Sequence, residues 1–290
     1  MRTSGRDHTW AMGVILVTGT SSGFGLLTAA ELVRRGHRVV ATMRDPAHSE
    51  ALRATIADGD GDGAALEVET LDVTDTGSVR RAIKTVIARH GRLDVVVNNA
   101  GIGTAGAVEE TAVDEFAAVF DTNVLGALRV IQAALPHMRE RRSGHIVNVT
   151  SIAAFVAPPF LAAYAASKHA LDAIGESLAG EVGRFGIAVT NVAPGAYDTR
   201  MTQDVDEVLA SVDPSSPYAE PLSTLVRNHA ASMRQNDDPR AVAVAVADAI
   251  EADPPPARVV VPPESGFIVE ARGATPPEQL RDLLAKSYGI

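Results

Sequence analysis

The sequence predicts an α/β fold built on a doubly wound parallel sheet of about seven strands, with helices on both faces. Short runs of β-branched and other apolar residues recur along the chain, and stretches with the spacing of amphipathic helices lie between them. Strand alternating with helix is typical of parallel sheets, because parallel neighbours must be joined by a crossover. Several of the strand runs are apolar at nearly every position, as expected for strands covered on both faces.

Seven runs are expected to form the strands. In chain order they are Val14–Val17, Arg38–Thr42, Leu66–Leu71, Val95–Val97, His145–Val149, Ile187–Val192 and Arg258–Val261. The intervening helical spacing is clearest in Leu26–Arg35, Val79–His90 and Ala241–Ile250. Pro276 and Pro277 predict the start of a last helix, since proline is tolerated in a first helical turn.

The 290 residues are expected to form one domain, because no linker or repeat divides the strand–helix alternation. Residues 1–10 are polar overall. Residues 1–12 are assigned to a flexible leader, and residues 13–290 to a single catalytic domain. Residues 197–237 contain three prolines and several acidic residues, and they break the alternation. A long irregular insertion in a compact domain is usually functional, so this segment is expected to be a substrate lid.

Composition excludes several classes of function. The net charge of −10 disfavours nucleic acid as a partner, because phosphate binding needs a basic surface. The absence of cysteine excludes a disulfide scaffold and a thiolate nucleophile, and the eight histidines show no paired metal-ligand spacing. No apolar run reaches the roughly 18 residues that span a bilayer, and no secretory signal precedes the first strand. We expect a cytoplasmic protein without metal, membrane or nucleic-acid partners.

A glycine-rich loop, Thr18–Gly25, follows the first predicted strand and opens the first helix. Glycines there permit a tight turn and let backbone N–H groups approach a pyrophosphate, while the helix N-terminus attracts the anion. This setting predicts dinucleotide binding by a Rossmann-type domain. A P-loop is excluded, because no Gly-Lys-Ser/Thr sequence closes the motif.

The end of the second predicted strand indicates which dinucleotide is preferred. Met43 occupies the position where an acidic residue would bind the ribose hydroxyls of NAD, and Arg44 follows it. A basic residue at this point pairs with the 2′-phosphate of NADP. NADP(H) is therefore favoured, and NAD(H) stays possible because Asp45 could neutralise Arg44 or serve the ribose itself.

Tyr164 and Lys168 are the sharpest chemical signal. On a helix, residues four apart share one face, so the ammonium of Lys168 is expected near the phenol of Tyr164. A neighbouring positive charge favours the phenolate and should lower the tyrosine pKa from about 10. Tyr164 would then be a usable acid or base near neutral pH.

These motifs, taken together with Asn98–Gly101, Asn123 and Ser151, resemble the short-chain dehydrogenase/reductase family. Ser151 lies 13 residues before Tyr164, and Asn123 lies 41 residues before it, which matches the family's spacing. Pro194 and Gly195, followed by Thr199, resemble the segment after the family's sixth strand. The resemblance runs from about residue 14 to residue 199.

The resemblance implies roles for particular residues. The implied catalytic residues are Asn123, Ser151, Tyr164 and Lys168. Tyr164 would exchange a proton with the substrate oxygen, Ser151 would hold that oxygen, and Lys168 would lower the tyrosine pKa and bind the nicotinamide ribose. Asn123 would bend its helix and hold a water of the proton relay. The implied cofactor-binding residues are Gly19, Thr20, Ser21, Ser22, Gly23, Phe24, Gly25, Arg44, Asp72, Val73, Asn99, Ala100, Gly101, Tyr164, Lys168, Pro194, Gly195 and Thr199.

The function predicted on this basis is NADP(H)-dependent interconversion of an apolar ketone or aldehyde and its alcohol. The substrate is expected to be apolar because residues 152–161, which follow Ser151, offer almost no polar group. Two alternatives stay open, an NAD-dependent dehydrogenase of a hydroxylated metabolite and a non-catalytic regulator that senses NADP. The family resemblance also implies a homodimer or homotetramer.

Overall fold

A computed structural model describes residues 12–59, 61–197, 208–210, 212–234 and 238–287. The predicted leader therefore lies outside the described residues except for Met12, which is exposed. Part of the predicted lid, including residues 198–207, also lies outside them.

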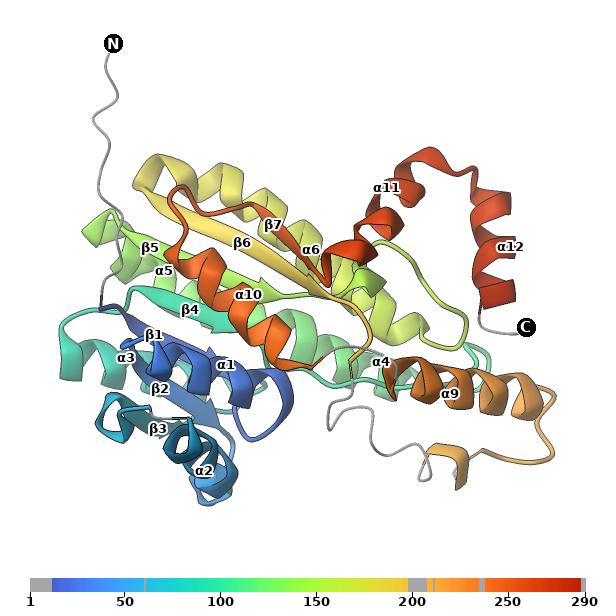
Figure 1. Ribbon diagram of the computed structural model, residues 1–290, viewed down its shortest axis with the longest axis horizontal. Coiled ribbons are helices and arrows are strands. Elements are labelled where there is room, and N and C mark those ends of the chain that lie inside the picture. The colour runs from blue at the N-terminus through green and yellow to red at the C-terminus, as the bar shows by residue number, and fades with distance from the viewer. Residues whose placement is uncertain (1–11, 60, 198–207, 211, 235–237, 288–290) are drawn as a thin grey trace, which may run out of the picture.

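Seven parallel strands form one sheet in the order β3-β2-β1-β4-β5-β6-β7 (Figure 1). This confirms the predicted α/β class and the number of strands. The strands are β1 (Val14–Thr18), β2 (Arg38–Met43), β3 (Leu66–Thr70), β4 (Val95–Asn98), β5 (Gly144–Val149), β6 (Ile187–Pro194) and β7 (Arg258–Val261). The order reverses between β1 and β4, and in such sheets ligands bind beyond the carboxyl ends of the strands at that point.

Helices cover both faces of the sheet. One layer contains α1 (Gly23–Arg34), α2 (Glu50–Asp58) and α10 (Arg240–Glu251), and the other contains α3 (Thr76–His90), α5 (Ala127–Arg141) and α6 (Ala162–Val182). The two core clusters lie between these layers and the sheet, because alternate side chains of each strand point to opposite faces.

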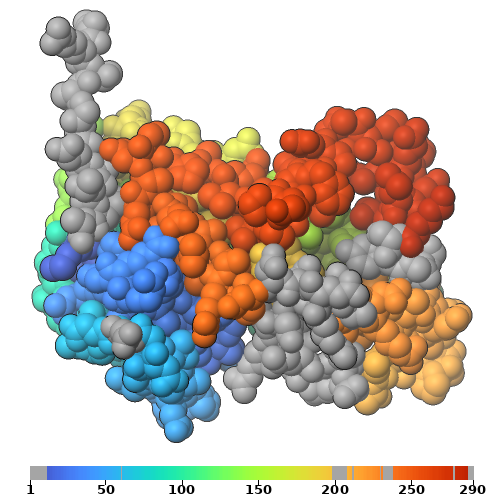
Figure 2. Space-filling view, in the orientation of Figure 1, coloured from blue at the N-terminus to red at the C-terminus, as the bar shows by residue number. Residues whose placement is uncertain are grey.

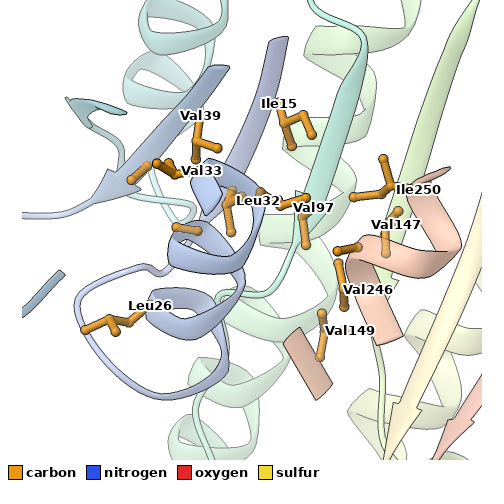
Figure 3. Packing of buried hydrophobic residues seen from close by; sticks show 14 of the residues in the cluster. Ile15, Leu26, Leu32, Val33, Val39, Val97, Val147, Val149, Val246 and Ile250 are labelled. Carbon is orange, nitrogen blue, oxygen red and sulfur yellow. The ribbon is translucent and has the colours of Figure 1, made fainter. Parts of the chain in front are cut away.

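The first cluster shows how the layers join. Leu32 of α1 and Ile250 of α10 pack over Ile15, Val97 and other strand residues (Figure 3). These four named side chains are fully buried. Burial of an aliphatic side chain of this size contributes about 1.5–3 kcal/mol, so the strand and helix positions predicted from apolar spacing are also the ones that hold the sheet together.

A π-helical turn, η3 (Asp121–Gly126), joins α4 (Val113–Phe120) to α5 without a break. Within the described residues, the resulting helix Val113–Arg141 is long and apolar enough to cross a membrane by length and composition alone. The expectation that no such stretch exists is therefore corrected. Core helices of soluble proteins pass the same test, and Val130, Ile131 and Ala134 of this helix are buried in the second core cluster.

The C-terminal part adds α9 (Ala219–Arg234), α11 (Gly266–Ala274) and α12 (Pro277–Ser287). In Figure 2, α9 (light orange) and α11 and α12 (red) lie on the same side of the molecule. Residues 197–237 were expected to be irregular, but α9 is regular over 16 residues. Pro221 does not prevent this, since it stands in the first turn, where no intrahelical N–H bond is lost. The short helices are η1 (Pro46–Ser49), η2 (Gly63–Ala65), η4 (Ile152–Ala154), η5 (Gly183–Phe185) and η6 (Pro263–Ser265).

Candidate active site

A cleft of about 460 Å³ opens beyond the carboxyl ends of the central strands. It brings together most of the residues that the sequence singled out. The predicted site residues that line it are Gly19, Ser21, Ser22, Gly23, Phe24, Arg44, Asp72, Val73, Asn99, Ala100, Gly101, Ser151, Tyr164, Lys168, Pro194 and Gly195. Among the described residues, no cluster of three or more His, Asp or Glu side chains could hold a metal ion.

Four predicted residues do not line the cleft. Thr20 is fully buried, and its Oγ1 donates to the Thr42 carbonyl at 3.2 Å. Gly25 lies beneath the loop, and Asn123 is buried behind the cleft wall. Thr199 lies outside the described residues. For the three described residues, the structure supports a role in shaping the cleft rather than in lining it.

The glycine loop leaves no room for side chains at two points. A Cβ on Gly19, whose φ is +69°, would lie 2.8 Å from the Cα of Ala100. A Cβ on Gly25 would lie 2.2 Å from the Gly19 carbonyl oxygen. Asn99 fastens the loop, because its Nδ2 donates to the carbonyls of Thr18 at 2.9 Å and Gly19 at 3.1 Å. The loop is thus held open toward the start of α1, which fits a dinucleotide pyrophosphate.

Opposite charges meet at the far end of the cleft. Burial acts to raise the pKa of Asp72, but hydrogen bonds from Thr74 and the positive charges of Arg44 and Arg129 outweigh it and lower that pKa. Arg44 itself is exposed. Asp45 turns away into η1, where its Oδ1 accepts from the Ala47 N–H at 2.9 Å.

Ser151, Tyr164 and Lys168 converge at the other end. Ser151 follows β5 by two residues and caps η4, with its Oγ accepting from the Ala153 N–H at 3.1 Å. It also hydrogen-bonds Tyr164. Lys168 lies one turn after Tyr164 on α6, as the spacing predicted. Its Nζ donates to the Val149 carbonyl at 2.9 Å and lies 5.7 Å from the centre of the Tyr164 ring.

The pKa of Tyr164 differs from the expectation. Burial raises it above its ordinary value, and the hydrogen bond with Ser151 opposes the rise. Burial also lowers the pKa of Lys168 to about 8. Burial of the phenol, and not the charge of Lys168, sets the direction of the shift in the Tyr164 pKa. The ammonium is directed at the Val149 carbonyl, and both groups have lost water.

Asn123 lies in the π-helical turn, at the position where the family resemblance implied a bend in the helix. Its Oδ1 accepts from the Ile102 N–H at 2.8 Å, and its Nδ2 donates to the Ile102 carbonyl at 2.9 Å and to Ser167 Oγ at 3.0 Å. The side chain therefore positions the loop after β4 against α6.

Sequence reasoning missed several residues of the cleft. They are Leu71, Thr74, Thr122, Val149 and Thr150. Most stand beside a predicted residue, and nothing in their own residue types marked them as part of a site. Ser167 was also missed, although it lies inside the Tyr164–Lys168 motif, because its two partners come together only in the folded chain.

Comparison with known proteins agrees with this geometry. The profile of the short chain dehydrogenase family matches residues 13–209. The chain therefore belongs to the short-chain dehydrogenase/reductase family, as its motifs led us to expect. It is an oxidoreductase that acts on CH–OH or C=O groups with NAD or NADP.

Individual relatives extend the match over most of the chain. A 3-ketodihydrosphingosine reductase of Bacteroides thetaiotaomicron is 34% identical over 250 residues, which cover 86% of this chain and 88% of the relative. A short-chain dehydrogenase structure from Streptomyces avermitilis is 33% identical, with a TM-score of 0.78, and covers 97% of this chain and 98% of that one. A variant of actinorhodin polyketide ketoreductase, solved with NADPH, is 30% identical with a TM-score of 0.74. The match covers 86% of this chain and 95% of that one.

Proposed function

We propose that this protein is an NADP(H)-dependent carbonyl reductase that interconverts an apolar ketone or aldehyde and its alcohol. The observation that carries the proposal is the meeting of Ser151, Tyr164 and Lys168 in the same cleft as the glycine loop. The glycine loop that would bind the dinucleotide lies at one end of the cleft, and Tyr164, the proposed proton donor, lies at the other end.

The side chains of the site would handle the proton and the orientation of the substrate. In reduction, the Tyr164 hydroxyl gives its proton to the carbonyl oxygen, which becomes the alcohol oxygen. Ser151 donates a hydrogen bond to that oxygen and holds it beside the tyrosine. The bound nicotinamide supplies the hydride to the carbonyl carbon, and accepts it in the reverse direction. Tyr164 would act as the acid in reduction and, as its phenolate, as the base in the reverse direction.

The cofactor would lie along the cleft. The backbone N–H groups of the Gly19–Gly25 loop would bind its pyrophosphate, and Asp72 and Val73 would contact the adenine. Lys168 would bind the nicotinamide ribose, and Asn99–Gly101 and Pro194–Gly195 would line the remaining walls.

A preference for NADP(H) is supported by the end of β2. Arg44 lines the cleft and is exposed, so its guanidinium is available to a 2′-phosphate. Asp45 caps η1 instead of serving a ribose, and Met43 stands where an acidic residue would bind the hydroxyls. The ketoreductase that is 30% identical was solved with NADPH.

An apolar substrate is supported by the surroundings of the catalytic end. Ile102 lines the cleft and is 41% exposed. Beyond it, α9 packs Leu222 and Leu225 against Ala105 and Phe160. Leu222 and Leu225 belong to the predicted lid, and we propose that this apolar wall covers the substrate. Tyr197, the first residue of the predicted lid, does not join this wall but packs in the core against Phe24, with ring centres 5.8 Å apart.

We further propose that the protein acts in the cytoplasm as a homodimer or homotetramer. The helix Val113–Arg141 supports an interface between copies, since Val113 is 82% exposed and Leu125 is 44% exposed. Light scattering coupled to gel filtration tests the oligomeric state. A monomer at micromolar concentration would exclude the proposed homodimer or homotetramer.

The test of the catalytic proposal follows NADPH oxidation at neutral pH with a panel of carbonyls, and NADH in parallel. The panel contains small polar ketones, aromatic aldehydes and long-chain ketones, with 3-ketodihydrosphingosine among them because of the relative that reduces it. Tyr164→Phe should lower kcat by about 10²–10⁴-fold while NADPH binding, measured by fluorescence, is retained. Faster turnover of the small polar ketones would overturn the substrate class, and an unchanged kcat in the variant would overturn the role of Tyr164.

A further inference from the structure

A row of polar residues crosses four strands beneath α6. Asn98, Asn148, Asn191 and Arg258 hold matching positions in β4, β5, β6 and β7. Nδ2 of Asn98 donates to Oδ1 of Asn148 at 3.0 Å, and Nδ2 of Asn148 donates to Oδ1 of Asn191 at 3.0 Å. All three asparagines are buried. Buried amides are costly unless they are hydrogen-bonded, so these bonds hold the three strands in register.

Asp172 of α6 determines the direction of this row. Nδ2 of Asn191 donates to the carbonyl and to Oδ1 of Asp172, both at 2.9 Å. Because a carboxylate only accepts, Asn191 must turn its nitrogen toward α6 and its oxygen toward Asn148. Asn148 must then turn its side-chain nitrogen toward Asn191 and its oxygen toward Asn98. Asn98 in turn donates from its nitrogen to that oxygen. One carboxylate on the helix therefore orients three amides in the sheet.

Arg258 completes the arrangement from β7. Its Nη2 donates to Oδ2 of Asp172 at 2.6 Å, so both carboxylate oxygens have partners. Its guanidinium carbon also lies 4.9 Å from the centre of the Phe155 ring. Phe155 belongs to the segment between Ser151 and α6. Arg258 thus joins the catalytic helix to the segment that begins at the catalytic serine.

Asp172 shares a helix face with the catalytic residues. It lies one turn after Lys168 and two turns after Tyr164. The helix is fastened at two successive turns, by Lys168 to the Val149 carbonyl and by Asp172 to Asn191 and Arg258. The second attachment therefore fixes how α6 lies on the sheet.

We propose that Arg258 and Asp172 are positioning residues for the proposed carbonyl–alcohol reaction, and the inference rests on that function. Their ion pair holds α6, which carries Tyr164, at a fixed place relative to the segment that begins at Ser151. Neither side chain lines the cleft. They act through the position of the Tyr164 hydroxyl relative to Ser151, because both hydroxyls must reach the same substrate oxygen in the proposed reaction.

Substitution of Arg258 tests the proposal. Arg258→Met removes both contacts, and Arg258→Lys keeps a cation for Asp172. The matched control is Arg92→Met, because Nε of Arg92 donates to Asp94 at 2.6 Å and Asp94 is buried before the start of β4, at the other end of the sheet. Arg258→Met should lower kcat about 10-fold or more and change the KM for NADPH less than about 2-fold, since displacement of a catalytic group by about 1 Å is costly.

Arg258→Lys should recover most of that kcat, and Arg92→Met should lower the melting temperature with kcat unchanged. A second measurement does not depend on activity. Amide hydrogen exchange in residues 162–172 should be faster in Arg258→Met than in the native chain or in Arg92→Met. Equal kcat and equal exchange in Arg258→Met and Arg92→Met would overturn the inference. If the native protein reduces no carbonyl, the proposed function fails, and the exchange comparison still decides the positioning role.

Discussion

The side-chain amide of Asn123 donates to Ser167 Oγ at 3.0 Å and so links the π-helical turn to the catalytic helix. Ser167 Oγ in turn donates to the Tyr164 carbonyl at 2.7 Å. Ser167 is fully buried, and Asn123 also binds both backbone groups of Ile102. One hydroxyl therefore connects the first turn of α6 to the loop that follows β4.

Ser167→Ala should lower kcat about 10-fold and the free energy of unfolding by about 1–2 kcal/mol, because a buried amide donor loses an acceptor. Steady-state kinetics and urea unfolding check the two effects. Ser177→Ala is the matched control on the same helix, where the hydroxyl is exposed and donates to Oε1 of Glu181 at 3.2 Å. An equal loss of activity in both variants would mean that Ser167 has no particular role.

Arg44→Ala should raise the KM for NADPH about 30-fold and leave the KM for NADH nearly unchanged, because only NADPH carries the 2′-phosphate that the guanidinium would bind. Initial rates with each cofactor measure the ratio. Arg53→Ala is the control, since Arg53 is exposed on the neighbouring α2 and does not line the cleft. A parallel rise of both KM values would show that Arg44 does not discriminate between the cofactors.

His145 should make the protein less stable in acid. It is fully buried at the second position of β5, with Nε2 2.9 Å from Thr190 Oγ1, and burial lowers its pKa to about 4. The unfolded chain takes up this proton near pH 6.5 and the folded chain near pH 4. The contribution of neutral His145 to the free energy of unfolding is therefore complete above pH 6.5. It falls by about 3 kcal/mol as the pH falls to 4.

His145→Gln should remove that part of the pH dependence, because glutamine can still donate to Thr190 and does not titrate. Urea unfolding of both proteins between pH 7 and pH 4 measures the difference. His48→Gln is the control, since His48 is exposed in η1. Parallel stability–pH curves for the native chain and His145→Gln would contradict the assignment.

The sequence predicted those features that depend on local pattern. Apolar runs located all seven strands, and the four-residue spacing placed Tyr164 and Lys168 on one helix face. The direction of the Lys168 ammonium depends on the Val149 carbonyl, which belongs to another element. The row from Asn98 to Arg258 also escaped prediction, because it exists only through the register of four strands. Contacts between distant segments carry no periodic signal.

Gly175→Ala should destabilise the protein, because α6 crosses the polar row at this residue. A Cβ at Gly175 would lie 2.1 Å from Oδ1 of Asn191 and 2.8 Å from Nδ2 of Asn148. Forcing the helix away from these buried amides should cost about 3 kcal/mol and also displace Tyr164, so kcat should fall as well. Gly180→Ala is the matched control, since the same helix has nothing within 4 Å of a Cβ at Gly180. That variant should gain about 0.5–1 kcal/mol from helix propensity and keep its activity. Urea unfolding and initial rates distinguish the two variants, and a Gly175→Ala protein as stable and active as Gly180→Ala would show that α6 can shift on the sheet without harm.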